Sequence, residues 1–202
     1  MDEWYLVAGL GNPGPQYERT RHNAGFLLAD RLARRWQADW SWERAFESRL
    51  ARALRGERRV LLCQPQTYMN ASGRAVAAVA RYFQVPADRI LVVVDDADLA
   101  LGQIRMRPGG GTGGHHGLES VTAHLGTPSY PRLRIGIGRQ PGAREITAHV
   151  LAPFGPEEWE RLQAVLDRAA EQVECWLEHG LARAMNLYNG WVQSPSGRSE
   201  AT

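Results

Sequence analysis

Short apolar runs along the chain alternate with segments in which apolar residues recur at helical spacing. The runs predict strands at residues 4–10, 48–54, 59–63, 90–94, 103–107 and 132–138. Helical spacing predicts helices at residues 24–38, 72–83 and 117–125, and a long helical segment at residues 156–189 that is interrupted near Gly180. Ser72 is the expected N-cap of the second helix. Some strands follow one another directly and others alternate with helices, so we expect an α/β fold with a mixed sheet and helices on both faces.

The length of the chain fits one well-buried domain. It has 202 residues, of which 44% are hydrophobic. We expect a single α/β domain over residues 1–193 and a disordered polar tail over residues 194–202. Residues 139–155 contain Pro141, Gly142 and Pro153 and have little periodicity, which is typical of a lid or a wall of a substrate site.

Composition argues against a secreted or membrane-spanning protein and leaves open why arginine is the basic residue used. The chain has no lysine, so all 24 basic residues are arginine, and the net charge is +2. Either genomic base composition or phosphate recognition by guanidinium groups explains the use of arginine alone. Because the net charge is small, any phosphate site must be a local patch. Cys63 and Cys175 are far apart, which indicates a reducing compartment. The acidic first residues do not resemble a signal peptide and no apolar run is long enough to span a membrane, so we expect a soluble, cytoplasmic protein.

A turn rich in glycine and proline follows the first predicted strand. Residues 9–14 read Gly-Leu-Gly-Asn-Pro-Gly, which matches the dinucleotide fingerprint G-x-G-x-x-G. That fingerprint requires a helix to begin at once, whereas here the helix begins near Asn23, and no acidic residue ends a second strand. The nicotinamide interpretation is therefore weak, and a tight turn that presents Asn12 is the better reading.

His22 lies near the end of this turn, at the predicted start of a helix. An imidazole there is favoured as a neutral base. Asp95 and Asp96 end the strand at residues 90–94, and the carboxyl ends of strands in an α/β sheet converge on one crevice. Either aspartate could orient His22, or both could simply cap a turn. Asn70 follows another strand and offers a donor and an acceptor, although ordinary helix capping also explains its segment.

A second glycine-rich segment, residues 108–117, runs from a strand into a helix. Arg105 and Arg107 flank it on one strand face, so the segment is either a flexible linker or an anion-binding loop, and we favour phosphate contact. The sequence has no cluster with zinc-ligand spacing, no G-x-S-x-G elbow and no Walker loop. These features favour hydrolysis by an activated water without a metal or cofactor.

Several of these segments closely resemble the motifs of bacterial peptidyl-tRNA hydrolases. Residues 9–25 resemble the family's opening motif, and residues 65–73 resemble its second motif. Residues 96–102, together with the glycine-rich run to Leu118, resemble a third, and residues 132–138 resemble a further segment. The resemblance extends over roughly residues 4–190 with the motifs in the family order.

The resemblance implies cleavage of the ester between a peptide and the 3′ ribose of tRNA. It implies that His22 is the general base, that Asp96 holds the His22 imidazole, and that Asn12 binds near the ester. The residues that the resemblance assigns to substrate or tRNA contact are Tyr17, Tyr68, Met69, Asn70, His116, Arg105, Arg107 and Arg134. It also implies tRNA as the partner, a monomer, no cofactor and no metal.

Two residues depart from the family pattern. His116 stands where the family has asparagine, and neutral imidazole divides its donor and acceptor between two nitrogens. Gln64 stands where lysine is common, which removes one positive charge. An RNA-binding relative without hydrolytic activity is the main alternative, and a dinucleotide-dependent oxidoreductase rests on residues 9–14 alone.

Overall fold

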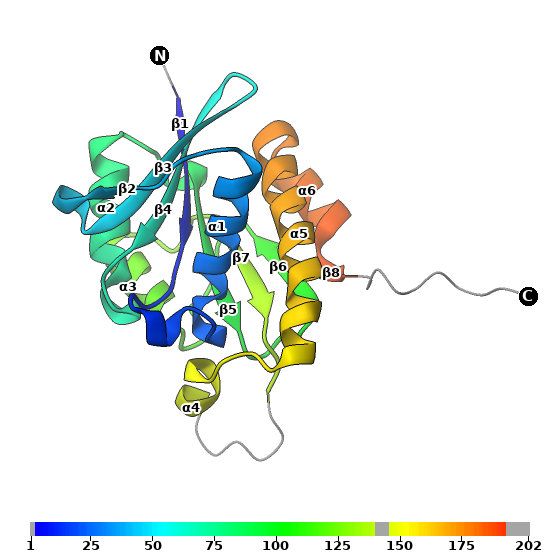
Figure 1. Ribbon diagram of the computed structural model, residues 1–202. Helices are drawn as coiled ribbons and strands as arrows, with labels where there is room; N and C mark the ends of the chain where they lie inside the picture. Colours follow the sequence, from blue (N-terminus) through cyan, green and yellow to red (C-terminus); the bar gives the residue numbers. More distant parts are fainter. Residues whose placement is uncertain (1–2, 140–145, 193–202) are drawn as a thin grey trace, which may run out of the picture.

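A single mixed sheet of eight strands forms the centre of the protein (Figure 1). The computed structural model describes residues 3–139 and 146–192. The strands lie in the order β2-β3-β4-β1-β5-β7-β6-β8. Their bounds are Trp4–Gly9 (β1), Ser41–Glu43 (β2), Ser48–Arg55 (β3), Arg58–Pro65 (β4), Ile90–Asp96 (β5), Gln103–Arg107 (β6), Arg132–Gly136 (β7) and Gly190–Trp191 (β8). The strands β4, β1, β5 and β7 run parallel, and the outer strands pair antiparallel.

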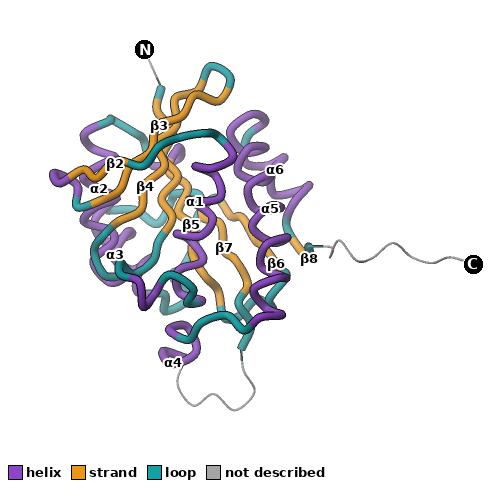
Figure 2. Tube along the Cα trace, in the orientation of Figure 1, coloured by secondary structure: helices purple, strands orange, loops and turns teal. Residues whose placement is uncertain are grey.

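Helices cover both faces of the sheet, as Figure 2 shows in purple. Their bounds are Ala24–Arg35 (α1), Ser72–Tyr82 (α2), His116–Leu125 (α3), Ile146–Leu151 (α4), Pro156–His179 (α5) and Leu181–Tyr188 (α6). One buried cluster joins α1, α5 and α6 to one face of the sheet, and a second joins α2 and α3 to the other face. The expected α/β fold with a mixed sheet and helices on both faces is thus confirmed.

Alternation along β5 explains how one strand serves both clusters. Leu91 and Val93 belong to the cluster with α1 and α5, whereas Val92 and Val94 belong to the cluster with α2 and α3. Side chains of a strand point alternately to opposite faces, so a strand covered on both sides is apolar throughout. This is why the continuous apolar run predicted a central strand.

The chain reverses its direction of winding at β1, in the middle of the sheet. The strands from β2 to β4 lie on one side of β1, and the strands from β5 onward lie on the other. Ligands in open α/β sheets bind beside the carboxyl ends of the strands at such a switch point. In Figure 1 the arrowheads of β1 and β7 point to the end of the molecule where α4 lies.

Two glycines bring the start of α1 against this end of the sheet. A Cβ on Gly25 would lie 2.4 Å from the backbone nitrogen of Leu10 and 2.4 Å from the carbonyl oxygen of Val93. A Cβ on Gly9 would lie 2.2 Å from the carbonyl oxygen of Gly25. These distances are too short for any side chain, so the two glycines permit the approach that places His22 beside β5.

The structure differs from the predicted elements in a few places. Ser72 is the first residue of α2 instead of its N-cap, and its hydroxyl has no partner among the described residues. The short elements β2, β8 and α4 were not predicted from periodicity. The expected tail at residues 194–202 lies outside the described residues. Within the described chain, no helix is both long enough and apolar enough to cross a membrane.

Candidate active site

His22 lies in a 3-10 turn, Arg21–Asn23, immediately before α1. Its Nδ1 is 2.9 Å from Oδ1 and 3.1 Å from Oδ2 of Asp95, at the end of β5. The carboxylate is an acceptor only, so Nδ1 carries the proton and donates it. In this tautomer Nε2 keeps its lone pair, and it has no hydrogen-bond partner within residues 3–139 and 146–192. His22 therefore presents an unprotonated nitrogen to the cavity that it lines.

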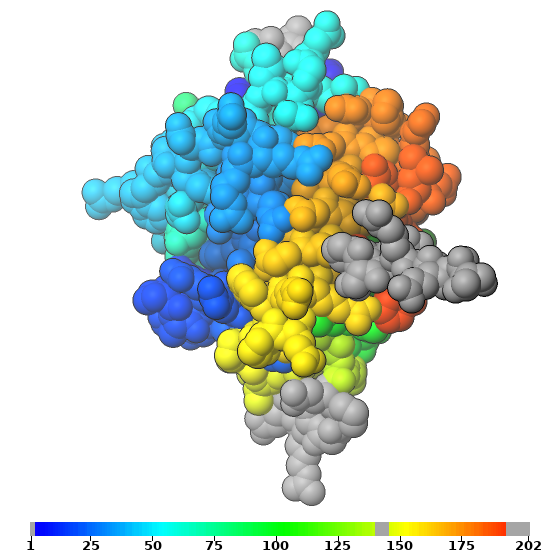
Figure 3. All heavy atoms as spheres, turned by 45° about the vertical axis from the view of Figure 1, so that its right-hand side comes forward, coloured from blue at the N-terminus to red at the C-terminus, as the bar shows by residue number. Residues whose placement is uncertain are grey.

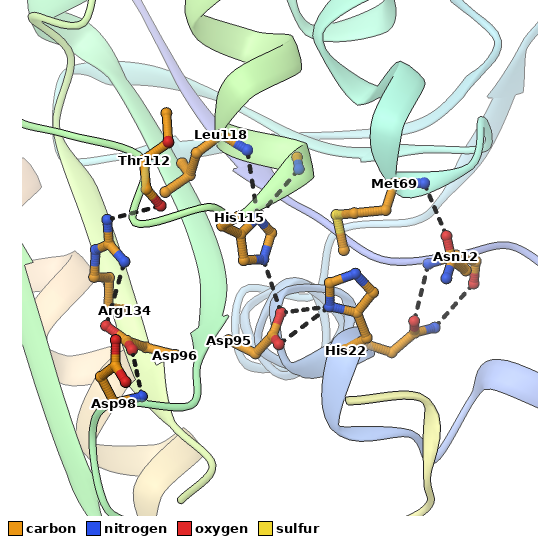
Figure 4. Close-up of polar contacts among 12 residues, drawn as sticks. Asn12, His22, Met69, Asp95, Asp96, Asp98, Thr112, His115, Leu118 and Arg134 are labelled. Carbon is orange, nitrogen blue, oxygen red and sulfur yellow. Dashed lines mark hydrogen bonds and ion pairs between the residues drawn. The ribbon is translucent and has the colours of Figure 1, made fainter. Parts of the chain in front are cut away.

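Asp95 accepts a hydrogen bond from a second histidine, His115, on the same oxygen, Oδ1. His115 Nε2 is 3.0 Å from Asp95 Oδ1 (Figure 4). His115 is also the N-cap of α3, and its Nδ1 accepts from the backbone N–H groups of Gly117 at 3.1 Å and Leu118 at 3.3 Å. Because Nδ1 accepts, the proton of His115 must be on Nε2, which donates to Asp95. The helix end thus fixes the tautomer of His115.

Asp95 is only 2% exposed, yet it is held as a carboxylate. Burial by itself would raise the pKa of Asp95. Attraction to His115 and hydrogen bonds from His115 and His22 together outweigh burial, so the pKa of Asp95 is well below its ordinary value. The site therefore holds a negative charge beside His22, where it would stabilise an imidazolium.

The resemblance assigned this role to Asp96, and the structure corrects that assignment by one residue. Asp96 points away from His22 and forms an ion pair with Arg134, with 3.3 Å between Oδ2 and the guanidinium. Asp95 continues the row of Leu91 and Val93, which faces α1, and so reaches His22. Alternation along the strand turns Asp96 to the opposite face.

Asn12 is buried on the other side of His22 from Asp95, as Figure 4 shows. Its backbone is clamped by Asn23, whose Oδ1 accepts from Asn12 N–H and whose Nδ2 donates to the Asn12 carbonyl, both at 2.9 Å. Asn12 Oδ1 accepts from the N–H of Met69 at 2.8 Å. That bond assigns the amide orientation and leaves Nδ2 as a donor at the cavity wall.

A cavity of about 560 Å³ lies in front of these groups. It is lined by His22, Asn12, Asp95, Asp96 and His115, by Tyr68, Met69 and Asn70 from the turn before α2, by His116 and Arg134, and by Ile146, Thr147, Val150 and Leu151 from α4. Part of the segment expected to be a lid or wall, residues 146–151, is therefore the wall helix α4, and residues 140–145 lie outside the described residues. The volume is within the range of small-ligand sites.

The other predicted contact residues are placed differently from one another. Tyr68 and Asn70 are exposed at the cavity rim, whereas Met69 is buried in its wall. His116 is also at the rim, with its Nδ1 3.1 Å from Glu119. Tyr17 is outside the set of described residues that line the cavity. Its carbonyl accepts from the Thr20 hydroxyl at 2.8 Å, which closes the turn before His22.

Arginines hold the glycine-rich loop through its carbonyl groups. Arg134 donates to the carbonyls of Gly111 at 2.9 Å and Thr112 at 3.4 Å. Arg132, which is buried, donates to Gly110 at 2.8 Å and to Pro128 at 2.6 Å. The loop is therefore anchored instead of being a free linker. Arg134 lines the cavity, but its guanidinium already serves Asp96 and the loop.

Arg105 and Arg107 are outside the cavity lining, on the neighbouring strand β6. Arg105 lies opposite Arg134 in the ladder and Arg107 lies opposite Arg132. Arg105 is half-buried and Arg107 is exposed. Within the described part of the chain, neither forms an ion pair. The unpaired guanidinium groups of β6 thus lie beside those of Arg132 and Arg134, which already bind protein groups.

His115 and Asn23 are site residues that the sequence analysis did not select. Both have recognisable sequence positions, because His115 lies two residues before a predicted helix and Asn23 follows His22. The signal for His115 was obscured by its neighbour His116, which lies at the family's asparagine position. Imidazole is also an unusual N-cap, so capping statistics do not single it out.

His22, Asp95 and His115 also form the one described group with the residue types of a metal site, with ligand atoms within 4.8 Å of one another. The hydrogen bonds argue against that use. His115 would have to present Nε2 without its proton, whereas the two amides that donate to its Nδ1 keep the proton on Nε2. The donor set therefore fits a histidine–carboxylate–histidine hydrogen-bond network better than a metal centre.

A mixed sheet with helices on both faces, and a cavity with converging polar side chains at the carboxyl ends of its parallel strands, define the class of α/β enzymes. The particular family is given by the relatives of the chain. Residues 6–196 match the family model described as peptidyl-tRNA hydrolase. The chain is 50% identical over 187 residues to the peptidyl-tRNA hydrolase of Gloeobacter violaceus, an alignment that covers 93% of this chain and 94% of the relative.

A second relative and a solved structure agree. The peptidyl-tRNA hydrolase of Symbiobacterium thermophilum is 49% identical over 191 residues, covering 91% of this chain and 98% of the relative. The crystal structure of the Acinetobacter baumannii peptidyl-tRNA hydrolase superposes with a TM-score of 0.88 at 34% identity, covering 95% of this chain and 97% of that one. The chain belongs to the peptidyl-tRNA hydrolase family.

Proposed function

We propose that the protein hydrolyses the ester between a peptide, or an N-blocked aminoacyl group, and the 3′ ribose of tRNA. Membership of the peptidyl-tRNA hydrolase family supports the substrate. The observation that carries the chemistry is the hydrogen bond from His22 Nδ1 to the buried Asp95, because it leaves Nε2 free toward the cavity. A histidine in this state is a general base for water.

The reaction begins when His22 Nε2 takes a proton from a water molecule. The water oxygen bonds to the ester carbonyl carbon, and the carbonyl oxygen becomes an oxyanion. The His22 imidazolium then gives its proton to the ribose 3′ oxygen as the ester bond breaks. The products are the free carboxyl of the peptide and the 3′ hydroxyl of tRNA, and His22 returns to its neutral form.

Fixed polar groups would stabilise the charges that develop. Asp95 lies against the imidazolium, and His115 keeps that carboxylate ionised and oriented. Asn12 Nδ2 is a donor whose direction is set by the Met69 amide, so it is preorganised for the ester carbonyl or its oxyanion. The exposed side chains of Tyr68, Asn70 and His116 would contact the rest of the substrate at the rim.

We further propose that the protein works as a cytoplasmic monomer, because its substrate is a product of interrupted translation. tRNA is its macromolecular partner. The unpaired Arg105 and Arg107 would face phosphates, whereas Arg134 would act chiefly by holding the glycine-rich loop. Size-exclusion chromatography with light scattering tests the monomer.

Release of N-acetyl-phenylalanine from N-acetyl-phenylalanyl-tRNA tests the reaction. The variant His22→Ala should lower kcat by ~10²–10⁴-fold, since it removes the base. Its tRNA affinity should stay near that of the unchanged protein in a filter-binding assay. The matched control is His179→Ala, which removes an exposed histidine at the end of α5. Turnover that survives His22→Ala would show that another group is the base.

The same assay separates the alternatives. Binding of tRNA without any release of N-acetyl-phenylalanine would identify an RNA-binding relative. EDTA should leave the rate unchanged. Loss of activity in EDTA and recovery with zinc would instead assign His22, Asp95 and His115 to a metal. A rise in melting temperature with NAD or NADP would revive the oxidoreductase interpretation.

A further inference from the structure

A side chain holds the outer edge of β6 beyond the point where this strand pairs with β8. The two strands pair at Gln103 and Ile104 and no further within the described residues. Beyond Ile104, the N–H of Met106 donates to Asn189 Oδ1 at 2.7 Å, and Asn189 Nδ2 donates to the Met106 carbonyl at 3.1 Å. The Asn189 amide thus offers one acceptor and one donor to a single residue, as a neighbouring strand would. It takes the place of a strand partner for Met106.

A buried glutamine of α5 orients this amide. Gln172 is 0% exposed, and its Nε2 donates to Asn189 Oδ1 at 2.9 Å and to the Ala184 carbonyl of α6 at 3.1 Å. Because Asn189 Oδ1 accepts from two donors, Nδ2 is fixed toward the Met106 carbonyl. Gln172 Oε1 is buried without a hydrogen-bond partner among the described residues, which costs stability. An apolar side chain would avoid that cost, so the orientation of Asn189 explains Gln172 better than packing does.

The two amides connect the C-terminal helices to the strand that carries two unpaired arginines. Asn189 lies between α6 and β8, and β8 adjoins β6 at the edge of the sheet (Figure 1). In Figure 3 the orange and red surface of the C-terminal part of the chain reaches the green surface of the part that includes β6. Met106 stands between Arg105 and Arg107, which we propose to face the tRNA phosphates. Asn189 therefore holds the one residue that both arginines flank.

This end of the β6–β7 ladder carries like charges on both strands. Arg105 lies opposite Arg134, and Arg107 lies opposite Arg132. Like charges directly opposite one another destabilise the pairing of strands. Arg132 and Arg134 donate to carbonyls of the glycine-rich loop, whereas the part of the chain that the structure describes gives Arg105 and Arg107 no ion pair. The hydrogen bonds of Met106 offset this repulsion and keep β6 in register.

From these contacts we infer that Asn189, oriented by Gln172, is a positioning residue for the binding of tRNA. It holds β6 so that Arg105 and Arg107 are in place before the phosphates arrive. The inference rests on the proposed function. Cations that are already ordered lose less conformational freedom on binding, so they bind more tightly. The chemical step at His22 should be unaffected, because β6 contributes no residue to the described lining of the catalytic cavity.

Asn189→Ala tests this role, because it removes both contacts with Met106 at a half-buried position. We expect Kd for tRNA, measured by filter binding, to rise about three- to tenfold as the ordering of β6 is lost. KM for N-acetyl-phenylalanyl-tRNA should rise with Kd, whereas kcat should stay unchanged. Gln172→Met, which nearly keeps the buried volume, should raise Kd in the same direction. Hydrogen exchange of the Met106 amide should become faster in both variants, because its acceptor is lost or less well oriented.

The same substitution in a protein without the two arginines shows whether Asn189 acts through them. In the double variant Arg105→Gln, Arg107→Gln, the further change Asn189→Ala should alter Kd less than about twofold, because no cation is left to position. The matched control is Asn186→Ala, which truncates an exposed amide on α6. This control should leave both Kd and the exchange of the Met106 amide unchanged.

An unchanged Kd in both Asn189→Ala and Gln172→Met would overturn the positioning role. An equal rise in Kd with and without the arginines would overturn it too, since the effect of Asn189 would then not pass through them. Failure of the proposed tRNA contact would look different. The double arginine variant would then bind tRNA as tightly as the unchanged protein, before any change at Asn189 is made.

Discussion

At the scale of single residues, the site depends on which of two adjacent aspartates faces His22. Asp95 accepts from His22 and His115, whereas Asp96 accepts from Arg134 and from the N–H of Asp98 at 2.8 Å. An asparagine at position 95 would offer a single acceptor oxygen to two histidine donors. Its NH₂ group would then favour a His22 tautomer with the proton on Nε2, which is no longer a base.

We therefore expect Asp95→Asn to lower kcat by ~10²–10⁴-fold in the N-acetyl-phenylalanyl-tRNA assay. Asp96→Asn should cost far less, because Asp96 contacts neither His22 nor His115 and an asparagine oxygen can still accept from the Asp98 N–H. The two variants are isosteric and adjacent, so each is the control for the other. A larger loss from Asp96→Asn would return the orienting role to Asp96 and contradict the contact with Asp95.

At the scale of elements, the turn that carries His22 is tied to the wall of the cavity by Arg21. The Arg21 side chain is 4% exposed. It donates to the carbonyls of Ala152 at 3.3 Å and Pro153 at 3.1 Å and to Glu158 at 2.7 Å, all in or after the segment that ends α4. One side chain therefore links the base to α4 and to the start of α5.

Arg21→Met should lower the free energy of unfolding by ~3–5 kcal/mol, because it leaves a partly buried carboxylate and buried carbonyls without their donor. It should also raise KM, since α4 lines the cavity. Urea denaturation and steady-state kinetics measure the two effects. The control is Arg74→Met, whose ion pair with Glu47 is more than half exposed, and which should change stability by less than ~1 kcal/mol. Equal changes in unfolding free energy and KM in Arg21→Met and Arg74→Met would contradict the role of Arg21 in linking the His22 turn to α4.

This link also predicts a pH dependence. Burial alone would raise the pKa of Glu158, but hydrogen bonds from the Gly155 N–H and from Arg21 outweigh it and lower that pKa below its ordinary value of 4.5. A carboxyl whose pKa is lowered by folding stabilises the protein above its ordinary pKa and loses that contribution as the pH falls below it. The difference in unfolding free energy between the unchanged protein and Glu158→Gln should therefore shrink below about pH 4.5. A constant difference would contradict the ion pair.

At the scale of the whole molecule, the fold could be predicted where local pattern and burial agree. The apolar run at Ile90–Val94 and the periodic helices fix their own secondary structure, and they were found. The edge strand Ser41–Glu43 and the helix Ile146–Leu151 are too short to have a pattern. The strand forms because β3 offers it a partner, and the helix packs against the turn Arg21–Asn23. Their prediction would require the tertiary structure.

The candidate site was predictable to the same extent. His22, Asn12 and Asn70 follow strand ends, so their convergence could be inferred from topology. Which of Asp95 and Asp96 faces His22 depends on the face of the sheet against which α1 packs. No local sequence pattern predicts that face. The role of His115 depends on the N-terminus of α3 and on a buried carboxylate from another strand. Such residues are recognised only once the chain is folded.

The unpaired arginines on β6 lead to a prediction about binding by the whole molecule. Arg105 and Arg107 share a strand face, and each lies opposite another arginine of β7. Like charges gathered in this way repel one another, and a polyanion relieves that repulsion when it displaces counterions.

If Arg105 and Arg107 contact the tRNA phosphates, Arg105→Gln and Arg107→Gln should each weaken tRNA binding and reduce the slope of log Kd against log salt by about 1. Arg44→Gln, an exposed arginine at the opposite edge of the sheet, is the matched control and should leave the slope unchanged. Equal slopes for all three variants would place the tRNA elsewhere on the surface, since a phosphate contact cannot be removed without returning its counterion.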